Sequence, residues 1–214
     1  MTRPELQKLV QSGEGEKLEF KKKANYPEKI VKELVAFANT HGGTLLLGVD
    51  DNGELTGTRD IEGEAFILEQ AINELIRPRL EYELNYHSLT EKKGIAIFHI
   101  PESSRKTHFV RENKHTRKGK AYVRVNDESV QASREVREIL QRRLKNRDIQ
   151  FTYGEKEKHL LNYLGEHPHI TLEEFVKLIN CSRYSGSRTL IRLVLANVLE
   201  ITPHPKGDLY SLKG

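Results

Sequence analysis

The chain has 214 residues, of which 31% are charged and 36% hydrophobic, and its formal net charge at pH 7 is +4. This composition is typical of a globular protein that buries two cores of unequal size, and it excludes a disordered chain. No apolar run approaches the roughly 18 residues of a membrane span. The N-terminus lacks an apolar signal core, and the single cysteine, Cys181, allows no internal disulfide. We therefore expect a cytoplasmic protein with no membrane partner.

The first quarter of the chain predicts helix, strand, helix, strand and turn. Residues 3–12 carry apolar side chains at helical spacing, and residues 17–23 alternate apolar and charged side chains as a strand does. A second helix over 27–41 begins with proline and is stopped by two glycines, which adopt the left-handed backbone of a helix end at little cost. The apolar run 45–49 predicts a strand buried on both faces, and residues 50–53 predict a hairpin turn.

The middle of the chain mixes strands and helices without regular alternation. The elements expected there are a helix at 61–76, strands at 80–87, 94–100 and 121–125, a long loop at 102–120, and a helix at 133–146 capped by Ser133. This order favours an α+β domain that occupies residues 1–148.

The last part of the chain changes character and predicts a small second domain at 149–214. A helix over 155–165 is followed by a capping box at Thr171 and Glu174, which starts a second helix. Ser182 or Ser185 can cap a third helix that runs through Leu199, and the chain ends in a hairpin with its tip at 206–208. Three short helices followed by a β-hairpin are typical of a winged helix-turn-helix.

Basic side chains are dense between residues 103 and 124, where a single acid, Glu112, interrupts them. Such a stretch suits phosphates, because each phosphate contact releases a condensed counterion. The alternative is an ordinary solvated loop. Among these residues, His108, Phe109 and Tyr122 could stack on bases. The nucleic-acid contacts expected in the first domain are Lys21, Lys22, Lys23, Arg111, Lys114, Arg117, Lys118, Lys120 and Arg124.

The third helix of the second domain carries Arg183, Tyr184, Arg188 and Arg192 near its start and along one face. Recognition helices of helix-turn-helix folds read the major groove with their N-terminal residues. We therefore expect these four side chains to contact DNA, although many winged helices mediate protein contacts instead.

Three acids could converge in the first domain. Glu14 and Glu19 lie before and within the first strand, and Asp51 follows the neighbouring strand. Three converging carboxylates can bind a hard divalent cation that polarises a phosphodiester, whereas the alternative is that all three are ordinary surface residues. No G-x-x-x-x-G-K-[ST] motif is present, so ATP binding is not expected.

The chain resembles the Schlafen AlbA-like (AlbA_2) domain proteins of the small prokaryotic type. The resemblance covers roughly residues 12–133 and rests on E-x4-EFK from Glu14 to Lys21, on LVAFANTHGGTLLLGVDDNGELTG, and on GKAYVRVNDESVQAS. It implies an α+β fold that binds nucleic acid, and the trailing winged helix is similar to that of predicted transcriptional regulators. In animal Schlafen proteins the domain type includes endoribonucleases acting on structured RNA such as tRNA. Their three acidic residues fall by motif on Glu14, Glu19 and Asp51, and their two copies of the domain form a cleft that a homodimer of this chain could rebuild.

The first interpretation is thus a DNA-binding transcriptional regulator that needs no cofactor to bind. The second is an endoribonuclease that depends on Mg²⁺ or Mn²⁺ held by Glu14, Glu19 and Asp51. The third is an interaction module that neither binds duplex DNA specifically nor cleaves RNA. In each case the partner is expected to be DNA, RNA or a protein, with a homodimer as the possible assembly.

Overall fold

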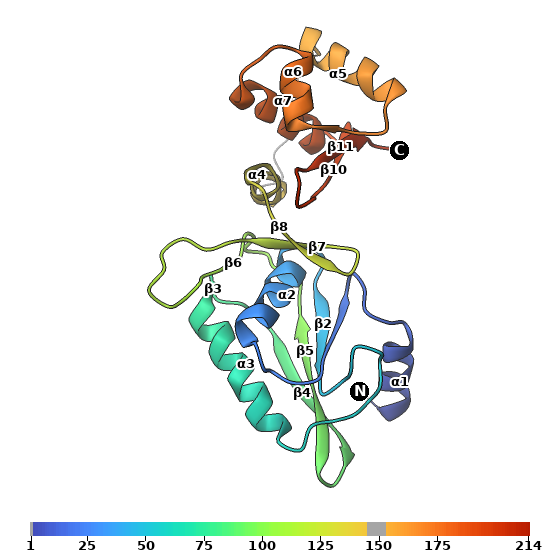
Figure 1. The fold of residues 1–214 in the computed structure, drawn as a ribbon, viewed down its shortest axis with the longest axis vertical. Coiled ribbons are helices and arrows are strands. Elements are labelled where there is room, and N and C mark those ends of the chain that lie inside the picture. The colour runs from blue at the N-terminus through green and yellow to red at the C-terminus, as the bar shows by residue number, and fades with distance from the viewer. Residues whose placement is uncertain (1, 145–152) are drawn as a thin grey trace. The chain divides into compact units, whose positions relative to one another are not determined.

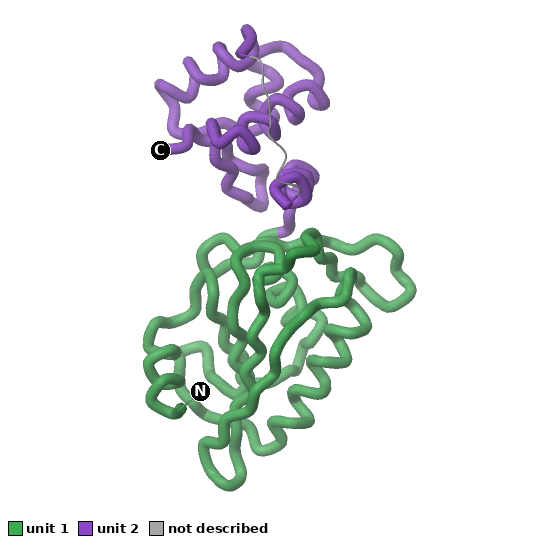
Figure 2. Tube along the Cα trace, turned by 180° about the vertical axis from the view of Figure 1, so that it is seen from behind, with its two compact units in different colours: residues 1–130 green, residues 131–214 purple. Residues whose placement is uncertain are grey.

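The computed structural model describes residues 2–144 and 153–214 and divides into two compact units, Met1–Val130 and Gln131–Gly214 (Figure 2). The division lies before the boundary expected after residue 148. The physical reason is helix α4 (Arg134–Arg143), which packs against α7 (Arg183–Leu195) and contributes Ile139 to the core of the C-terminal unit. The helix was expected to continue to residue 146, which lies outside the described residues.

A four-stranded mixed sheet organises the N-terminal unit (Figure 1). Its strands, in spatial order, are β1 (Leu18–Lys21), β2 (Gly43–Leu47), β5 (Lys93–Ile100) and β4 (Glu83–Thr90). Strands β1 and β2 are parallel, and the other pairs are antiparallel. Because the parallel pair places Lys21 beside Leu47, the segments that follow both strands leave the sheet at the same end, the carboxyl end of the two strands. The mixed α+β class expected from the sequence is confirmed.

Helices cover both faces of this sheet. Helices α2 (Pro27–Asn39) and α3 (Ile61–Leu75) pack on one face with Leu45 and Phe98, and helix α1 (Arg3–Gln11) packs Leu6 on the other face. Leu45, Leu46 and Leu47 of β2 are fully buried, as expected for a strand covered on both sides. The core therefore holds β1 and β2 rigidly between layers.

Several strand boundaries differ from the expected ones. Strand β4 ends at Thr90 rather than residue 87, because its pairing with β5 continues to the turn that joins the two. The turn at 50–53 forms, with Gly53 N–H donating to the Asp50 carbonyl, but no hairpin follows it. The expected loop at 102–120 contains a short strand. The remaining strands of this unit are β3 (Ile76–Arg77), β6 (Phe109–Val110), β7 (Tyr122–Val125) and β8 (Glu128–Gln131), paired as β3–β6 and β7–β8.

The C-terminal unit consists of short helices and a three-stranded antiparallel sheet around its own core. Beside α4 and α7 its elements are α5 (Glu155–Glu166), β9 (Ile170–Thr171), α6 (Leu172–Leu178), β10 (Leu199–Thr202) and β11 (Leu209–Leu212). The capping box of Thr171 and Glu174 is present, and Ser182 caps α7. Helix α7 ends four residues earlier than expected, at Leu195, because Asn197 takes a left-handed backbone with φ of 58° and Leu199 enters β10.

Within residues 2–144 and 153–214, none of the helices has both the length and the apolar character required to cross a bilayer.

A buried amide joins the end of α2 to the segment around β6 and β7. Asn39 is fully buried; its Nδ2 donates to the carbonyls of His108 and Tyr122 at 3.0 and 2.9 Å, and its Oδ1 accepts from His108 N–H at 2.8 Å. These bonds satisfy backbone groups that no neighbouring strand pairs. The amide therefore holds the backbone of His108 and Tyr122 against the end of α2.

Asn39→Ala is expected to lower the free energy of unfolding by about 3 kcal/mol, because it leaves buried backbone donors and acceptors unpaired. Urea denaturation followed by circular dichroism measures the change. Asn73→Ala, at an exposed position of α3, serves as the control and should stay within about 0.5 kcal/mol of wild type. Equal stability of the two variants would contradict the role assigned to Asn39.

Candidate functional site

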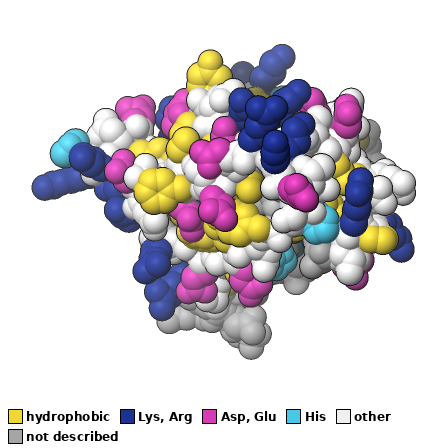
Figure 3. Space-filling model, turned by 90° about the horizontal axis from the view of Figure 1, so that it is seen from below, with side chains coloured by type: hydrophobic (Ala, Val, Ile, Leu, Met, Phe, Trp, Pro, Cys, Tyr) yellow, Lys and Arg dark blue, Asp and Glu magenta, His cyan; other side chains and the backbone are white. Residues whose placement is uncertain are grey.

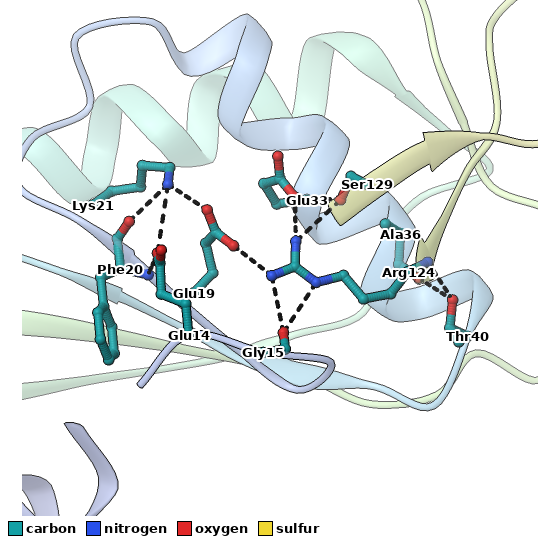
Figure 4. A network of polar contacts seen from close by, with 10 residues as sticks. All are labelled: Glu14, Gly15, Glu19, Phe20, Lys21, Glu33, Ala36, Thr40, Arg124 and Ser129. Carbon is teal, nitrogen blue, oxygen red and sulfur yellow. Dashed lines mark hydrogen bonds and ion pairs between the residues drawn. The ribbon is translucent and has the colours of Figure 1, made fainter. Parts of the chain in front are cut away.

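Two predicted acids meet at one lysine beside strand β1. Lys21 Nζ forms a short ion pair with Glu19 Oε1, lies 3.9 Å from Glu14 Oε1, and donates to the Phe20 carbonyl at 2.8 Å (Figure 4). Glu14 Oε1 also accepts from Phe20 N–H at 2.7 Å, which folds the segment before β1 back onto the strand. The structure thus brings Glu14 and Glu19 together, as the sequence pattern predicted.

Strand β1 alternates as expected, but its second face is not exposed. Phe20 is 1% exposed in the apolar layer beneath the strand, whereas Glu19, on the opposite face, is 7% exposed. Glu19 is buried because Arg124 of β7 covers it, with Nη2 only 2.6 Å from Glu19 Oε2. Each oxygen of the Glu19 carboxylate therefore has a cationic partner, Lys21 on one side and Arg124 on the other.

The guanidinium of Arg124 is fully engaged inside the N-terminal unit. Five hydrogen bonds use its nitrogens: two reach the Gly15 carbonyl at 3.1 and 2.9 Å, and the others reach Glu19, Glu33 and Ser129 (Figure 4). The group also lies 5.0 Å from the centre of the Phe37 ring. Only 1% of the side chain is exposed. The expectation that Arg124 contacts nucleic acid is therefore wrong, because no part of its charge faces solvent.

Burial raises the pKa values of the carboxyl groups around this network. Desolvation raises the pKa of Glu33, and the charge of Glu19 raises it further, while Ser129 and Arg124 lower it. Desolvation is also the main cause of the raised pKa of Glu14, against the Phe20 hydrogen bond, and the charges of Glu19 and Asp51 add to it. The negative charges of both other predicted acids therefore affect the pKa of Glu14.

The third acid, Asp51, lies in the turn after β2 and is exposed. Its neighbour Asp50 pairs with Lys22 at 2.6 Å, which ties this turn to the segment after β1. Carboxylate oxygens are suitable ligands for Mg²⁺ or Mn²⁺. Among residues 2–144 and 153–214, however, no three His, Cys, Asp or Glu side chains are grouped so that they could hold a metal ion. The arrangement as it stands does not fit the metal, and the catalytic and metal-binding roles of Glu14, Glu19 and Asp51 stay predictions.

The basic loop of the N-terminal unit is partly structural. Arg111 Nη2 donates to the Glu74 carbonyl at 2.6 Å, so its guanidinium is held against the end of α3. His108, expected to stack on bases, is only 2% exposed; its ring bonds to Pro78 O at 3.0 Å and Ser103 Oγ at 2.7 Å. Burial lowers the pKa of His108. Base stacking by His108 is therefore excluded. The predicted basic residues of this unit that remain exposed are Lys22, Lys23, Lys114, Arg117, Lys118 and Lys120.

One face of the structure shows how charged side chains are distributed. On the face drawn in Figure 3, Lys and Arg side chains lie in several separate groups with Asp and Glu between them. Basic side chains therefore do not form a continuous surface on that face. Within the N-terminal unit, Lys22 pairs with Asp50.

Helix α7 divides its side chains sharply between core and solvent. Leu190, Leu193 and Val194 are buried in the C-terminal core, whereas the predicted contact residues Arg183, Tyr184, Arg188 and Arg192 are all exposed. Tyr184, Arg188 and Arg192 follow each other at intervals of four and so form one stripe on the helix. Arg188 lies over the Tyr184 ring, 5.6 Å from its centre, and donates to its hydroxyl at 3.2 Å.

This stripe borders a groove of about 550 Å³ that α7 shares with the start of α5. Lys156 of α5 lies on the other side and donates to Ser185 Oγ at 2.7 Å. The groove is therefore lined by three cations and one aromatic ring, together with Glu155 and Glu157. Three of the four predicted residues, Tyr184, Arg188 and Arg192, come together at this groove, whereas Arg183 does not line it.

The sequence pattern did not indicate Glu33 and Ser129, which complete the Arg124 network, or the buried pair Glu135 and Asp208 in the C-terminal unit. Arg124 lies between Val123 and Val125 in the strand 121–125, and the alternation of a strand places it on the face opposite to theirs. This pattern predicts an exposed arginine, so no local signal indicated its buried partners.

Arg124→Met is expected to lower the free energy of unfolding by about 3–5 kcal/mol, because it leaves the half-buried Glu33 without its cation and the buried Glu19 with Lys21 alone. Adding Glu19→Gln to this variant should restore part of the loss, and urea denaturation measures both. Arg105→Met, which removes an exposed cation from the same chain segment, is the control. If the Arg124 and Arg105 variants were equally stable, the network would have no role in folding.

The chain was compared with known families and structures. The family model described as Schlafen, AlbA_2 matches residues 14–133. No curated protein matches the chain. The crystal structure of the DIP2311 protein from Corynebacterium diphtheriae is similar at 18% identity and a TM-score of 0.44, covering 70% of this chain and 32% of that protein. This chain thus spans about a third of that relative's length.

The solution structure of the N-terminal domain of a protein from Nitrosomonas europaea, described as a putative ATP-dependent DNA helicase RecG-related protein, is similar at 20% identity and a TM-score of 0.41. It covers 61% of this chain and 90% of that domain. The family match extends over more than half of the 214 residues and includes the Glu14–Lys21 segment and the strand of Arg124. The chain therefore belongs to the Schlafen AlbA_2 family.

Proposed function

We propose that this protein binds duplex DNA through helix α7 and acts as a transcriptional regulator. The observation that supports the proposal best is the exposed stripe of Tyr184, Arg188 and Arg192 on a helix whose opposite face is buried. Two features of recognition helices coincide there: exposed cationic side chains and a helix that is anchored by its buried face.

The C-terminal unit is proposed to be a winged helix-turn-helix. In this proposal α6 and α7 are the helix-turn-helix, and the hairpin β10–β11 with β9 is the wing sheet. Asn180 supports the tight turn between the helices, because it takes a left-handed backbone with φ of 46°. Arg183 and Tyr184 then lie at the start of α7, which is the part of a recognition helix that reaches base edges.

The N-terminal unit would add phosphate contacts through its exposed lysines and arginines. Arg117, Lys118 and Lys120 are close in sequence and exposed on the loop between β6 and β7. A homodimer is the proposed binding form, because it would present two copies of α7 to a palindromic site. No metal or other cofactor takes part in this binding.

The double variant Arg188→Ala, Arg192→Ala tests the proposal in fluorescence anisotropy with duplexes selected from a random pool. Affinity should fall at least about tenfold, and the slope of log K against log salt should become shallower by about two, one for each lost phosphate contact. Sedimentation of the complex reports whether two copies bind.

The matched control is Arg59→Ala, Arg79→Ala, which removes two exposed arginines of the N-terminal unit and so changes net charge equally. Circular dichroism confirms that both double variants are folded. Equal loss of affinity in the two would mean that only total charge matters. Absence of binding by the wild type would contradict the proposal.

The second candidate is an endoribonuclease centred on Glu14 and Asp51. The specific observation in its favour is the contact of Glu14 and Glu19 with one lysine, together with the influence of Asp51 on Glu14. Among the described residues, these acids are not grouped so that they could hold a metal ion. Glu19 is an unsuitable residue for the test, since replacing it also disturbs Arg124.

Incubation of labelled tRNA with the protein, in Mn²⁺ or in EDTA, tests this candidate. Glu14→Gln and Asp51→Asn should each slow cleavage at least about a hundredfold if these groups act on the reacting phosphate. Both variants should keep the wild-type unfolding midpoint. Glu16→Gln, an exposed neighbour, is the control. Intact tRNA under all conditions, or cleavage that persists in EDTA, would refute a metal-dependent nuclease.

A further inference from the structure

The C-terminal unit contains a cavity of about 460 Å³ that shares no lining residue with the groove between α5 and α7. The start of α4, the start of α6, the first residue of α7 and the β10–β11 hairpin line it. Its volume lies within the range of about 300–1,000 Å³ typical of small-molecule sites.

Two buried carboxylates lie in the wall of this cavity. Glu135 is 8% exposed and accepts from Ser187 Oγ at 2.7 Å, and Asp208 is 9% exposed and accepts from Ser133 Oγ at 2.5 Å. Among the residues that the structure describes, no Lys, Arg or His side chain forms an ion pair with either carboxylate within 4.0 Å. Asp208 is also hydrogen-bonded to the backbone of His204, an exposed residue in the lining of the cavity. Both acids therefore have hydrogen-bond partners but no ion-pair partner in this unit.

The third buried polar group of the cavity is the hydroxyl of Tyr210. Tyr210 is 1% exposed, and its hydroxyl has no hydrogen-bond partner within the described parts of the chain. Burial raises the pKa of Tyr210, and the negative charges of Asp208 and Glu135 raise it further. An unpaired buried hydroxyl is unfavourable, and its cost is removed when a ligand supplies the missing partner.

Basic side chains are present only at the rim. Arg183 and Lys206 are both exposed, and Arg183 pairs with Glu173 at 3.2 Å. Charge is therefore arranged by depth, with carboxylates inside and cations outside. Since an ion pair is stronger where water is excluded, the inner acids dominate the selection of a ligand.

We propose that this cavity binds a small organic cation, a primary amine or a guanidine, held by Asp208 and Glu135 and hydrogen-bonded to Tyr210. An ammonium or guanidinium group carries several N–H donors, so it can donate to both carboxylates and to the phenolic oxygen. An anion would meet like charge at these acids, and a neutral alcohol would leave them without a counter-charge. The proposal of a cation site does not rest on the proposed DNA binding.

Calorimetric titration of the full-length protein with agmatine, without nucleic acid, tests the site. One molecule should bind per chain, whereas 1-pentanol and succinate should not bind. Asp208→Asn keeps the shape and the hydrogen bond from Ser133 but removes the charge, and it should weaken agmatine binding about thirtyfold or more. Glu173→Gln, at the exposed rim, is the matched control and should change affinity by no more than about threefold.

Tyr210→Phe provides a second test that does not depend on Asp208→Asn folding. Removing an unpaired hydroxyl should leave the unfolding midpoint unchanged or higher, yet agmatine affinity should fall about threefold to tenfold. Tyr163→Phe, on α5, is the control variant for affinity. The proposal is overturned if agmatine does not bind at millimolar concentration, if pentanol binds equally well, or if Tyr210→Phe lowers stability without changing agmatine affinity.

Discussion

A single buried guanidinium holds the N-terminal unit together. Arg124 joins the Gly15 loop, strand β1 through Glu19, helix α2 through Glu33, and strand β8 through Ser129. Taking three charges out of water is expensive, and it is compensated only because each nitrogen finds a partner of good geometry. The network therefore contributes mainly to the specificity of the fold, that is, to which arrangement of these segments is stable. Any other arrangement of these four segments would leave at least one charge buried and unpaired.

This constraint changes the meaning of the acidic motif. Glu19 is shared between Lys21 and Arg124 and so belongs to the framework, whereas Glu14 contacts Lys21 only at 3.9 Å. Two acids in one short segment can thus differ in role: one is structural, with two close cationic partners, and the other has no cation closer than 3.9 Å. Desolvation raises the pKa of Glu14, and it also raises the pKa of Glu33, which belongs to the Arg124 network. Loss of activity on replacing Glu19 would not separate chemistry from folding.

Local patterns predicted the elements whose signals are local. The α2 helix, the buried strand β2 and the capping box at Thr171 all follow from spacing within a few residues, and the structure confirms them. The same reasoning misassigned Arg124, because its partners Glu19 and Glu33 lie 105 and 91 residues away in sequence. In a stretch of eight basic residues, nothing local separates a buried side chain such as that of Arg124 from those that face solvent.

His108 shows the same limit for a neutral side chain. A histidine among arginines and lysines suggests a base-stacking group, yet its ring is fixed by Ser103 and by Pro78, thirty residues earlier.

The sequence pattern did not indicate the buried acids of the C-terminal unit for a related reason. Asp208 reads as an ordinary residue at a hairpin tip, and only the fold brings Ser133, seventy-five residues earlier, against it. Burial of polar groups is a property of tertiary contacts, so the sequence indicates candidates for function but not their surroundings.

Helix α7 separates two surfaces of the C-terminal unit that depend on its first turn. Tyr184 and Arg188 line the basic groove, while Arg183, one residue earlier, lines the acidic cavity. A cation in the cavity would offset the negative charge beside Arg183 and leave more of the positive potential of α7 available to phosphates. Linkage requires the reverse effect as well, so bound DNA would tighten binding of the cation by the same factor. Coupling of the opposite sign would require the helix to move, because electrostatics alone cannot produce it.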